Sequence, residues 1–142
     1  MTVPISRTST SGSRILRSVW AVVAGVLVIF ALSLGTDQIL HMLQVYPPWG
    51  QPMYDTGLNA LALAYRLVFA VLGGYVTARL APHSPMRHAL VLGVVGVVLS
   101  LLGAIAAMSK DLGPDWYPWS LVVTSIPCAW LGGVLQGKRR AG

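Results

Sequence analysis

The sequence predicts an all-α polytopic membrane protein whose four transmembrane helices form an antiparallel bundle. The first reason is composition: 55% of the 142 residues are hydrophobic, 10% are charged, and the mean hydropathy is +0.68. Soluble domains carry charge on roughly a quarter of their positions, so this chain has too little polar surface to dissolve as a globule. The expected surroundings are therefore the lipid bilayer.

The second reason is the distribution of charge along the chain. Eight of the ten basic residues lie on one side of four apolar stretches, and all four acidic residues lie at or beyond the other side. The eight bases are Arg7, Arg14, Arg17, Arg79, Arg87, Lys138, Arg139 and Arg140, and the four acids are Asp37, Asp55, Asp111 and Asp115. Lys and Arg in short loops stay on the cytoplasmic side, so both termini are predicted to be cytoplasmic. Topology and anionic headgroups then explain the net charge of +6, and no nucleic-acid partner is expected.

The apolar stretches define the four helices in order. A spanning helix needs about 20 mostly apolar residues, and the chain offers four such runs within a single transmembrane domain, residues 18–137. The predicted spans are approximately residues 19–40, 58–80, 88–108 and 119–136. Residues 1–17, rich in Ser, Thr and Arg, are predicted to be a disordered basic cytoplasmic tail, and residues 138–142 a second basic cytoplasmic tail. A cleaved signal peptide is the alternative for the first span, although its apolar stretch exceeds the roughly 7–15 residues usual for such signals.

The connections between the spans differ in length. The turn at 81–85 is short and bounded by prolines, so the second and third spans are predicted to be antiparallel neighbours. The outer loop at 45–57 contains three prolines and three aromatic residues. Aromatic side chains concentrate at headgroup level, and the six outer aromatics are predicted to be interface anchors. They are Tyr46, Trp49, Tyr54, Trp116, Tyr117 and Trp119.

Small residues recur on the helix faces that are expected to pack together. Helices associate within lipid through close contact of small residues, and the third span carries them at alternating spacings of four and three. The residues expected at helix contacts are Gly73, Gly93, Gly96, Ser100, Gly103, Ala129 and Gly133. Pro127 lies inside the fourth span and is expected to kink it, with Thr124 or Ser125 bonding the carbonyl that the proline leaves free.

Arg66 lies inside the second span and requires a partner. An arginine at the centre of a spanning helix costs roughly 2.5–3.5 kcal/mol on insertion scales. If the spans begin and end as predicted, Arg66 lies ~12 Å and Asp37 ~5 Å below the outer surface, within reach of each other. His41 is one helical turn after Asp37. Asp55 and Asn59 stand at the start of the second span, and these two residues or Tyr65 are expected to complete the cluster.

Three interpretations of this polar cluster remain open. The first is a structural ion pair between Asp37 and Arg66, with hydrogen bonds completed by His41 and Asn59. The second is a substrate or proton site open to the outside, because intramembrane ionisable residues often mark such pathways. The third is a metal or catalytic site formed by His41, Asp37 and Asp55. The first is favoured, and no metal site or cofactor is expected.

Catalytic motifs are missing from the sequence. It contains no phosphate-binding loop, nucleophile elbow, paired-cysteine motif or zincin helix, and no glutamate. Its single cysteine, Cys128, excludes an internal disulfide. An enzyme is therefore not expected; a lipid-modifying enzyme is a distant alternative that would need a nucleophile or metal.

Several runs of the sequence carry a family resemblance. The segment GTDQILHMLQVYPPWGQPMYD, followed by LALAYR, GGYVTARLAP and PMRHAL, resembles a group of small four-helix bacterial integral membrane proteins. The resemblance extends over most of the chain after residue 15. It implies a bacterial inner-membrane setting and brings no activity with it.

The sequence thus leads to two functional hypotheses. The favoured one is a small structural or accessory protein that packs against itself or a larger membrane partner. The alternative is a small oligomeric transporter with an outward-facing site at Arg66 and Asp37. The two differ in oligomeric state and in whether Arg66 is paired or free.

Overall fold

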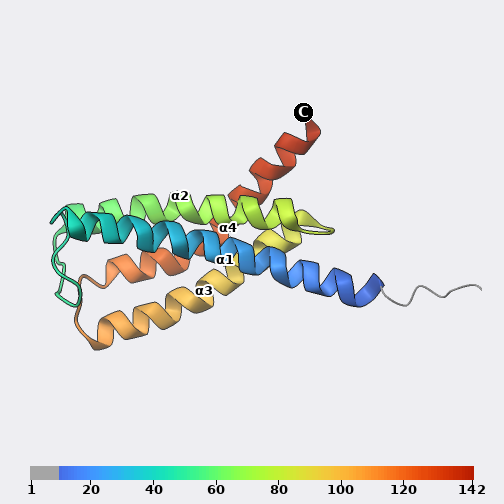
Figure 1. Cartoon of the computed structure of the whole chain (residues 1–142). Helices are drawn as coiled ribbons and strands as arrows, with labels where there is room; N and C mark the ends of the chain where they lie inside the picture. The colour runs from blue at the N-terminus through green and yellow to red at the C-terminus, as the bar shows by residue number, and fades with distance from the viewer. Residues whose placement is uncertain (1–9) are drawn as a thin grey trace, which may run out of the picture.

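A computed structural model describes residues 10–142, and these residues form four helices with no strand among them. The helices are α1 (Thr10–Met42), α2 (Thr56–Leu80), α3 (Pro85–Ser109) and α4 (Trp116–Ala141). They run up and down as an elongated bundle, and each is long and apolar enough to cross a membrane (Figure 1). The predicted fold class is confirmed: this is an all-helical, multi-pass membrane protein.

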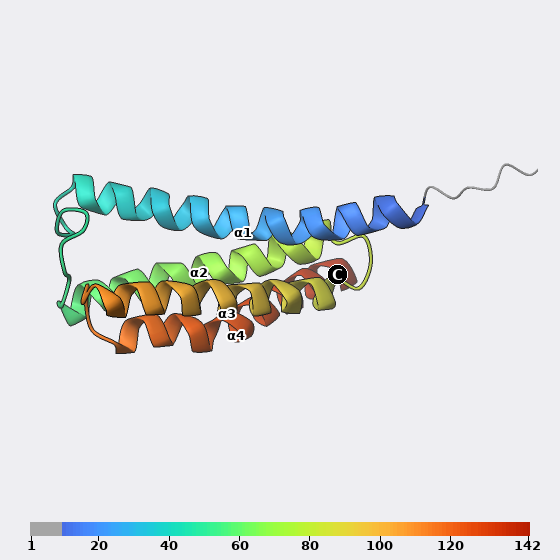
Figure 2. The same cartoon turned by 90° about the horizontal axis from the view of Figure 1, so that it is seen from below.

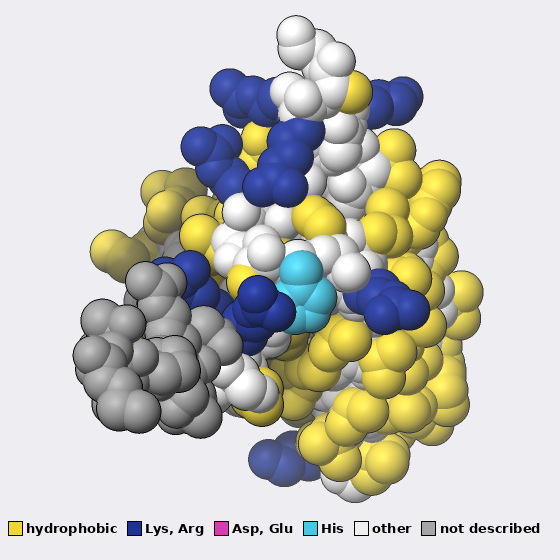
Figure 3. All heavy atoms as spheres, turned by 90° about the vertical axis from the view of Figure 1, so that its right-hand side faces the viewer, with side chains coloured by type: hydrophobic (Ala, Val, Ile, Leu, Met, Phe, Trp, Pro, Cys, Tyr) yellow, Lys and Arg dark blue, Asp and Glu magenta, His cyan; other side chains and the backbone are white. Residues whose placement is uncertain are grey.

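The ends of the described chain lie at the same end of the bundle, together with the α2–α3 turn (Figure 1). Viewed from this end, Lys and Arg side chains are prominent, and no acidic side chain is visible among the described residues (Figure 3). We call this the basic end. The opposite end, which carries the loops 43–55 and 110–115, is called the loop end. The separation of charge along the chain is therefore also a separation in space.

Two predicted boundaries were wrong. Helix α1 begins at Thr10, so residues 10–17 are helical and not a disordered tail; residues 1–9 lie outside the described residues. Once an apolar helix has formed, each further residue extends it without a new nucleation cost. Helix α4 likewise continues to Ala141, so the predicted tail at 138–142 is largely helix. Its three basic residues occupy the last turn, where cations stabilise the helix dipole.

Local signals fix the two ends of the α2 helix and the turn into α3. Asp55 is the N-cap of α2, and its side chain accepts a hydrogen bond of 2.8 Å from the backbone N–H of Leu58. At the other end Ala81 adopts an extended conformation that ends the helix. Ser84 is left-handed, with φ of 41°, and Pro85 then opens α3 at a position where its missing N–H costs nothing. This short turn sets α2 and α3 antiparallel.

Helix α2 is the central helix of the basic half of the bundle. It packs on α1, α3 and α4, whereas α1 packs on α2 and over a shorter stretch on α3. Figure 2 shows α1 lying along one side of the other three helices. Helix α1 is accordingly the least enclosed of the four: 11% of its most apolar segment is buried, against 22% for the others.

Glycines allow the backbones of α2 and its neighbours to touch. A Cβ at Gly74 would lie 2.5 Å from the Ala129 carbonyl oxygen, and one at Gly132 would lie 2.5 Å from the Tyr75 backbone nitrogen. On the α1 side, a Cβ at Gly73 would overlap the side chain of Ile29. At Gly74 and Gly132 the atoms in the way are backbone, so no larger residue fits there without movement of a neighbouring helix.

The predicted small-residue stripe of α3 holds over part of its length. A Cβ at Gly93 would lie 3.0 Å from Ile126 Cα, and one at Gly96 would lie 3.3 Å from Ser125 Cβ. Ser100 Oγ is 3.4 Å from Ser125 Oγ. Gly103, however, has nothing within 4 Å. Helices α3 and α4 diverge towards the loop end (Figure 1), so this part of the stripe no longer contacts the neighbouring helix.

The remaining predicted contacts lie on α4. Gly133 faces α3, where a Cβ would lie 3.0 Å from Ala89 Cβ, and Ala129 is 3% exposed against Gly74. Pro127 is inside α4, and the second half of this helix diverges from the direction of the first (Figure 1). The side chains of Thr124 and Ser125 donate to the carbonyls of Ser120 and Leu121. The expectation that they bond the freed carbonyl of residue 123 was wrong.

Candidate functional site

The central contact near the loop end is an ion pair between α1 and α2. Arg66 Nη2 lies 2.5 Å from Asp37 Oδ2, and the hydroxyl of Tyr65 donates to the other carboxylate oxygen of Asp37. Asp37 is 4% exposed, while the Arg66 side chain keeps 29% of its surface. Both carboxylate oxygens on α1 thus receive hydrogen bonds from α2. A buried carboxylate without such partners would cost several kcal/mol, so the three side chains form one unit.

Tyr46 extends this unit into the loop that follows α1. Its hydroxyl is 3.2 Å from that of Tyr65 and 3.4 Å from the carbonyl oxygen of Leu58. Tyr46 is 6% exposed, and this burial is the main reason that the pKa of its hydroxyl is raised. The prediction that Tyr46 is an interface anchor was wrong. The prolines that follow it turn the chain back over the bundle, so the ring lies beneath the loop.

Tyr117 covers the opposite side of Arg66. The guanidinium carbon of Arg66 lies 5.8 Å from the centre of the Tyr117 ring, within range of a cation–π contact. This residue, too, was predicted to be an interface anchor, and it instead lies beside the ion pair. By contrast, Trp49 and Tyr54 are 59% and 54% exposed, as anchors would be.

The other three residues of the predicted cluster lie apart from the ion pair. His41 stacks on Trp49, with ring centres 4.0 Å apart, and its Nδ1 is buried without a partner among the described residues. Asp55 caps α2. Asn59 Nδ2 donates to the carbonyl oxygens of Met53 and Asp55, at 2.9 and 2.8 Å. The expectation that His41 and Asn59 complete the hydrogen bonds of the pair was therefore wrong; tyrosines do so.

The two loops at this end are joined to each other. The backbone N–H of Met53 donates to the carbonyl oxygen of Leu112 at 2.8 Å, and the Tyr54 hydroxyl donates to Asp111 Oδ1 at 2.5 Å. The hydrogen bond to Asp111 is also the main reason that the pKa of Tyr54 is raised. Gly113 permits this contact, since a Cβ there would lie 2.8 Å from the Met53 carbonyl oxygen.

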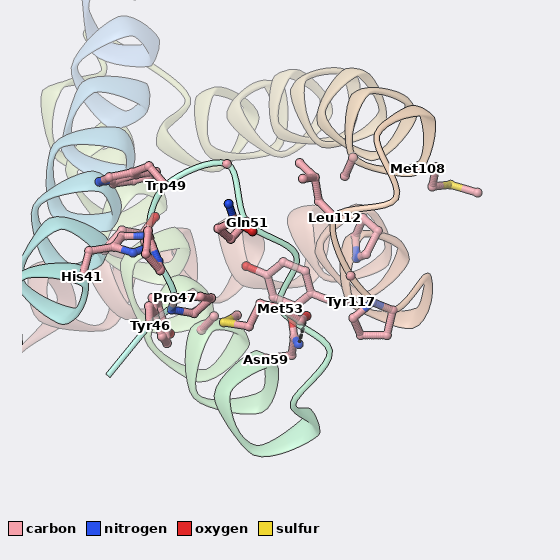
Figure 4. Close-up of a pocket in the computed structure, with 18 of the residues that line it drawn as sticks. His41, Tyr46, Pro47, Trp49, Gln51, Met53, Asn59, Met108, Leu112 and Tyr117 are labelled. Carbon is pink, nitrogen blue, oxygen red and sulfur yellow. Dashed lines mark hydrogen bonds between the residues drawn. The ribbon is translucent and has the colours of Figure 1, made fainter. Parts of the chain in front are cut away.

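Beneath the joined loops lies a cavity of about 270 Å³, which we call the outer cavity (Figure 4). Aromatic, proline and methionine side chains form half of its lining, and Asp37, Arg66 and Asp115 contribute charge. Figure 4 shows the Tyr117 hydroxyl pointing into the cavity, and it makes no hydrogen bond with a described residue.

A second cavity, of about 390 Å³, lies among the four helices at the level of the spans. We call it the inner cavity. Its lining is almost entirely apolar, and it includes the face of α3 from Gly96 to Gly103 that leaves α4. Arg66 and Tyr117 line both cavities, so they stand at the junction between the cavity that contains the two carboxylates and the more apolar one. The spacing of residues in the sequence does not reveal that Tyr117 lies beside Arg66, or that the two cavities meet at these side chains.

No protein-family model, curated protein or solved structure matches the chain. Among residues 10–142, no group of three or more His, Cys, Asp or Glu side chains is arranged to hold a metal ion. The ion pair, its tyrosines and the two cavities are therefore the features on which a function is argued.

Proposed function

We propose that this protein is an accessory component of a bacterial inner membrane that acts by helix packing with itself or with a larger membrane partner, and not by catalysis. The observation that carries the proposal is the pairing of Arg66 with Asp37. The arginine has its countercharge within the chain, so no substrate is required to neutralise it. An ionisable pair of this kind holds two helices together where their backbones separate.

Helix α1 supports the same proposal. It contacts two of the three other helices and is the least buried of the four. Large apolar side chains such as Leu27, at 55% exposure, and Ile39, at 57%, lie along its free side. In a membrane this side contacts either lipid or another helix, and it is the surface on which we place the partner.

Photo-crosslinking in the membrane tests this surface. We would introduce a photoreactive amino acid at Leu27 on α1 and, as a matched control, at Val123 on α4, which is 72% exposed. The expected result is one discrete protein adduct from Leu27, with a second copy or a single larger partner, and none from Val123. The absence of a protein adduct from Leu27, or equal adducts from both positions, would contradict the proposal.

The proposed orientation places the basic end in the cytoplasm. It is supported by the separation of charge between the two ends of the bundle. Gln51 and Ser84 are exposed at opposite ends, so single cysteines at these positions, in a chain with Cys128→Ser, provide the test. Impermeant thiol reagents should label position 51 from outside and position 84 only after the membrane is opened. The reverse pattern would overturn the orientation.

The second candidate is a small oligomeric transporter. It is favoured by the outer cavity, which has Arg66 and Asp37 in its lining. Native mass spectrometry of the gently extracted protein separates the candidates. A defined oligomer that repeatedly retains one water-soluble small molecule would favour transport, whereas a monomer carrying only lipid would favour the accessory role.

A further inference from the structure

The inner and outer cavities meet at two side chains that have unused hydrogen-bond donors. The guanidinium of Arg66 carries five N–H groups, and one of them donates to a described residue, Asp37. The Tyr117 hydroxyl donates to none and points into the outer cavity (Figure 4). Both residues line both cavities. A molecule that occupied both cavities would therefore pass directly beside two free donors.

The inner cavity is suited to an apolar chain. Its lining comes from all four helices and is mainly apolar, with Phe30 and Leu34 on the α1 side. These two side chains line the cavity and are still 47% and 53% exposed. The cavity is thus open at the side of the bundle between α1 and α3, the least closely packed pair of neighbouring helices. A lipid chain enters from the bilayer without crossing a polar barrier.

The charges at the junction of the two cavities restrict which lipid headgroups can bind beside the chain. Arg66 is neutralised by Asp37, and Asp115 also lines the outer cavity. An anionic headgroup would meet a compensated arginine and an extra carboxylate, and a cationic ammonium group would offer no acceptor to the unused N–H and O–H donors. The unused donors call for acceptor oxygens without charge. A compact carbonyl-bearing group among the rings of Tyr46, Trp49 and Tyr117 satisfies these conditions.

We propose that the two cavities together bind one lipid with a long apolar chain and a compact, uncharged headgroup that carries carbonyl oxygens. The chain lies in the inner cavity, and a carbonyl oxygen accepts hydrogen bonds from the Tyr117 hydroxyl and the free N–H groups of Arg66. Prenylated quinones and acylglycerols share this chemistry. The site goes beyond the proposed accessory role and does not depend on a partner, because it lies within a single chain.

Native mass spectrometry of the delipidated, purified chain tests the site with three probes: a quinone with two isoprene units, 1-monooleoylglycerol and oleate. We expect one molecule of a neutral probe to be retained, with the stronger of the two identifying the source. Oleate should bind at least about tenfold more weakly, because its carboxylate is unmatched. Failure to retain either neutral probe, or tighter retention of oleate, would overturn the proposal.

Two variants locate the bound molecule, and a matched control accompanies the second. Tyr117→Phe keeps the ring beside Arg66 and removes the hydroxyl, so affinity for the retained probe should fall about tenfold.

Gly103→Leu should abolish retention, because a Cβ at Gly103 meets nothing within 4 Å and the side chain extends into the inner cavity. Gly35 is equally free of contacts but lines neither cavity, so Gly35→Leu should bind as the wild type does. Equal binding by Tyr117→Phe and wild type, or equal loss in both leucine variants, would show that the lipid is not held at this junction.

Discussion

The basic half and the loop half of the bundle are held together by different forces. In the basic half, α2 meets α1 and α4 at glycines whose backbones touch, and the buried side-chain hydrogen bond between helices is that of Thr77 to the Ala21 carbonyl. In the loop half the helices separate, and side chains bridge the space: the ion pair, its tyrosines and two cavities. Close packing is sufficient where backbones approach. Where they do not, buried charge is tolerated only if its partner lies on the neighbouring helix.

The largest effect should follow from removing the cation of the loop half. Arg66→Leu leaves Asp37 buried at 4% exposure without a countercharge, which should lower the free energy of unfolding by about 3–5 kcal/mol. Arg87→Leu, which removes an exposed arginine, should change it by no more than about 0.5 kcal/mol. Unfolding by SDS in mixed micelles measures both. Equal effects of the two variants would mean that the pair does not hold the loop half together.

The sign of a glycine substitution should depend on contact, and so should differ between Gly132 in the basic half and Gly103 in the loop half. Gly132→Ala places a methyl group against the α2 backbone and should destabilise the bundle by about 1–3 kcal/mol. Gly103→Ala meets nothing within 4 Å and should stabilise it by up to about 0.5–1 kcal/mol through helix propensity. The same unfolding assay compares them. If both variants were destabilised alike, backbone contact would not be what packs the basic half.

The two halves also differed in how much the sequence could reveal. The spans, their order and the packing positions Gly73, Gly93 and Gly96 depend on composition and helical periodicity, which are local properties of the chain. Gly74 and Gly132, where the backbones of α2 and α4 meet, were not predicted, because each follows or precedes another glycine and periodicity alone did not single it out. The partner of Arg66 was also within reach, because Asp37 is the acid at a matching depth. Tyr46 and Tyr117 were misplaced because their positions depend on how the two loops fold back over the bundle. Hydropathy places an aromatic residue at a depth but does not say whether its ring faces lipid or the bundle.

Tyr65 should have a smaller effect than either Arg66 or Gly132. Tyr65→Phe removes the hydroxyl that donates to Asp37 but retains the ring and the ion pair. Side-chain hydrogen bonds between membrane helices contribute about 0.6–1.7 kcal/mol, and a loss in this range is expected. The control is Tyr75→Phe, whose hydroxyl takes part in an exposed hydrogen bond with Arg139. A loss for Tyr65→Phe no greater than for this control would show that the hydroxyl does not support the pair.

The smallest effect is expected at the contact between the two loops. Tyr54→Phe removes an exposed hydrogen bond to Asp111, so the stability of the bundle should be unchanged. Amide hydrogen exchange in the segment 50–54 should nevertheless become faster, because this segment, which covers the outer cavity, loses a hydrogen bond to the 110–115 loop. Unchanged exchange would indicate that the Met53–Leu112 hydrogen bond alone holds the loops.

The most direct test of the account is exchange of the two charges that join α1 to α2. Asp37→Arg and Arg66→Asp each place like charges side by side in the loop half, whereas the double variant restores an opposite pair. If the pair is structural, the double variant should retain more folded protein than either single variant, with a coupling of at least about 1 kcal/mol in the unfolding assay. Equal loss in all three variants would contradict the claim that this ion pair holds the loop half of the bundle together.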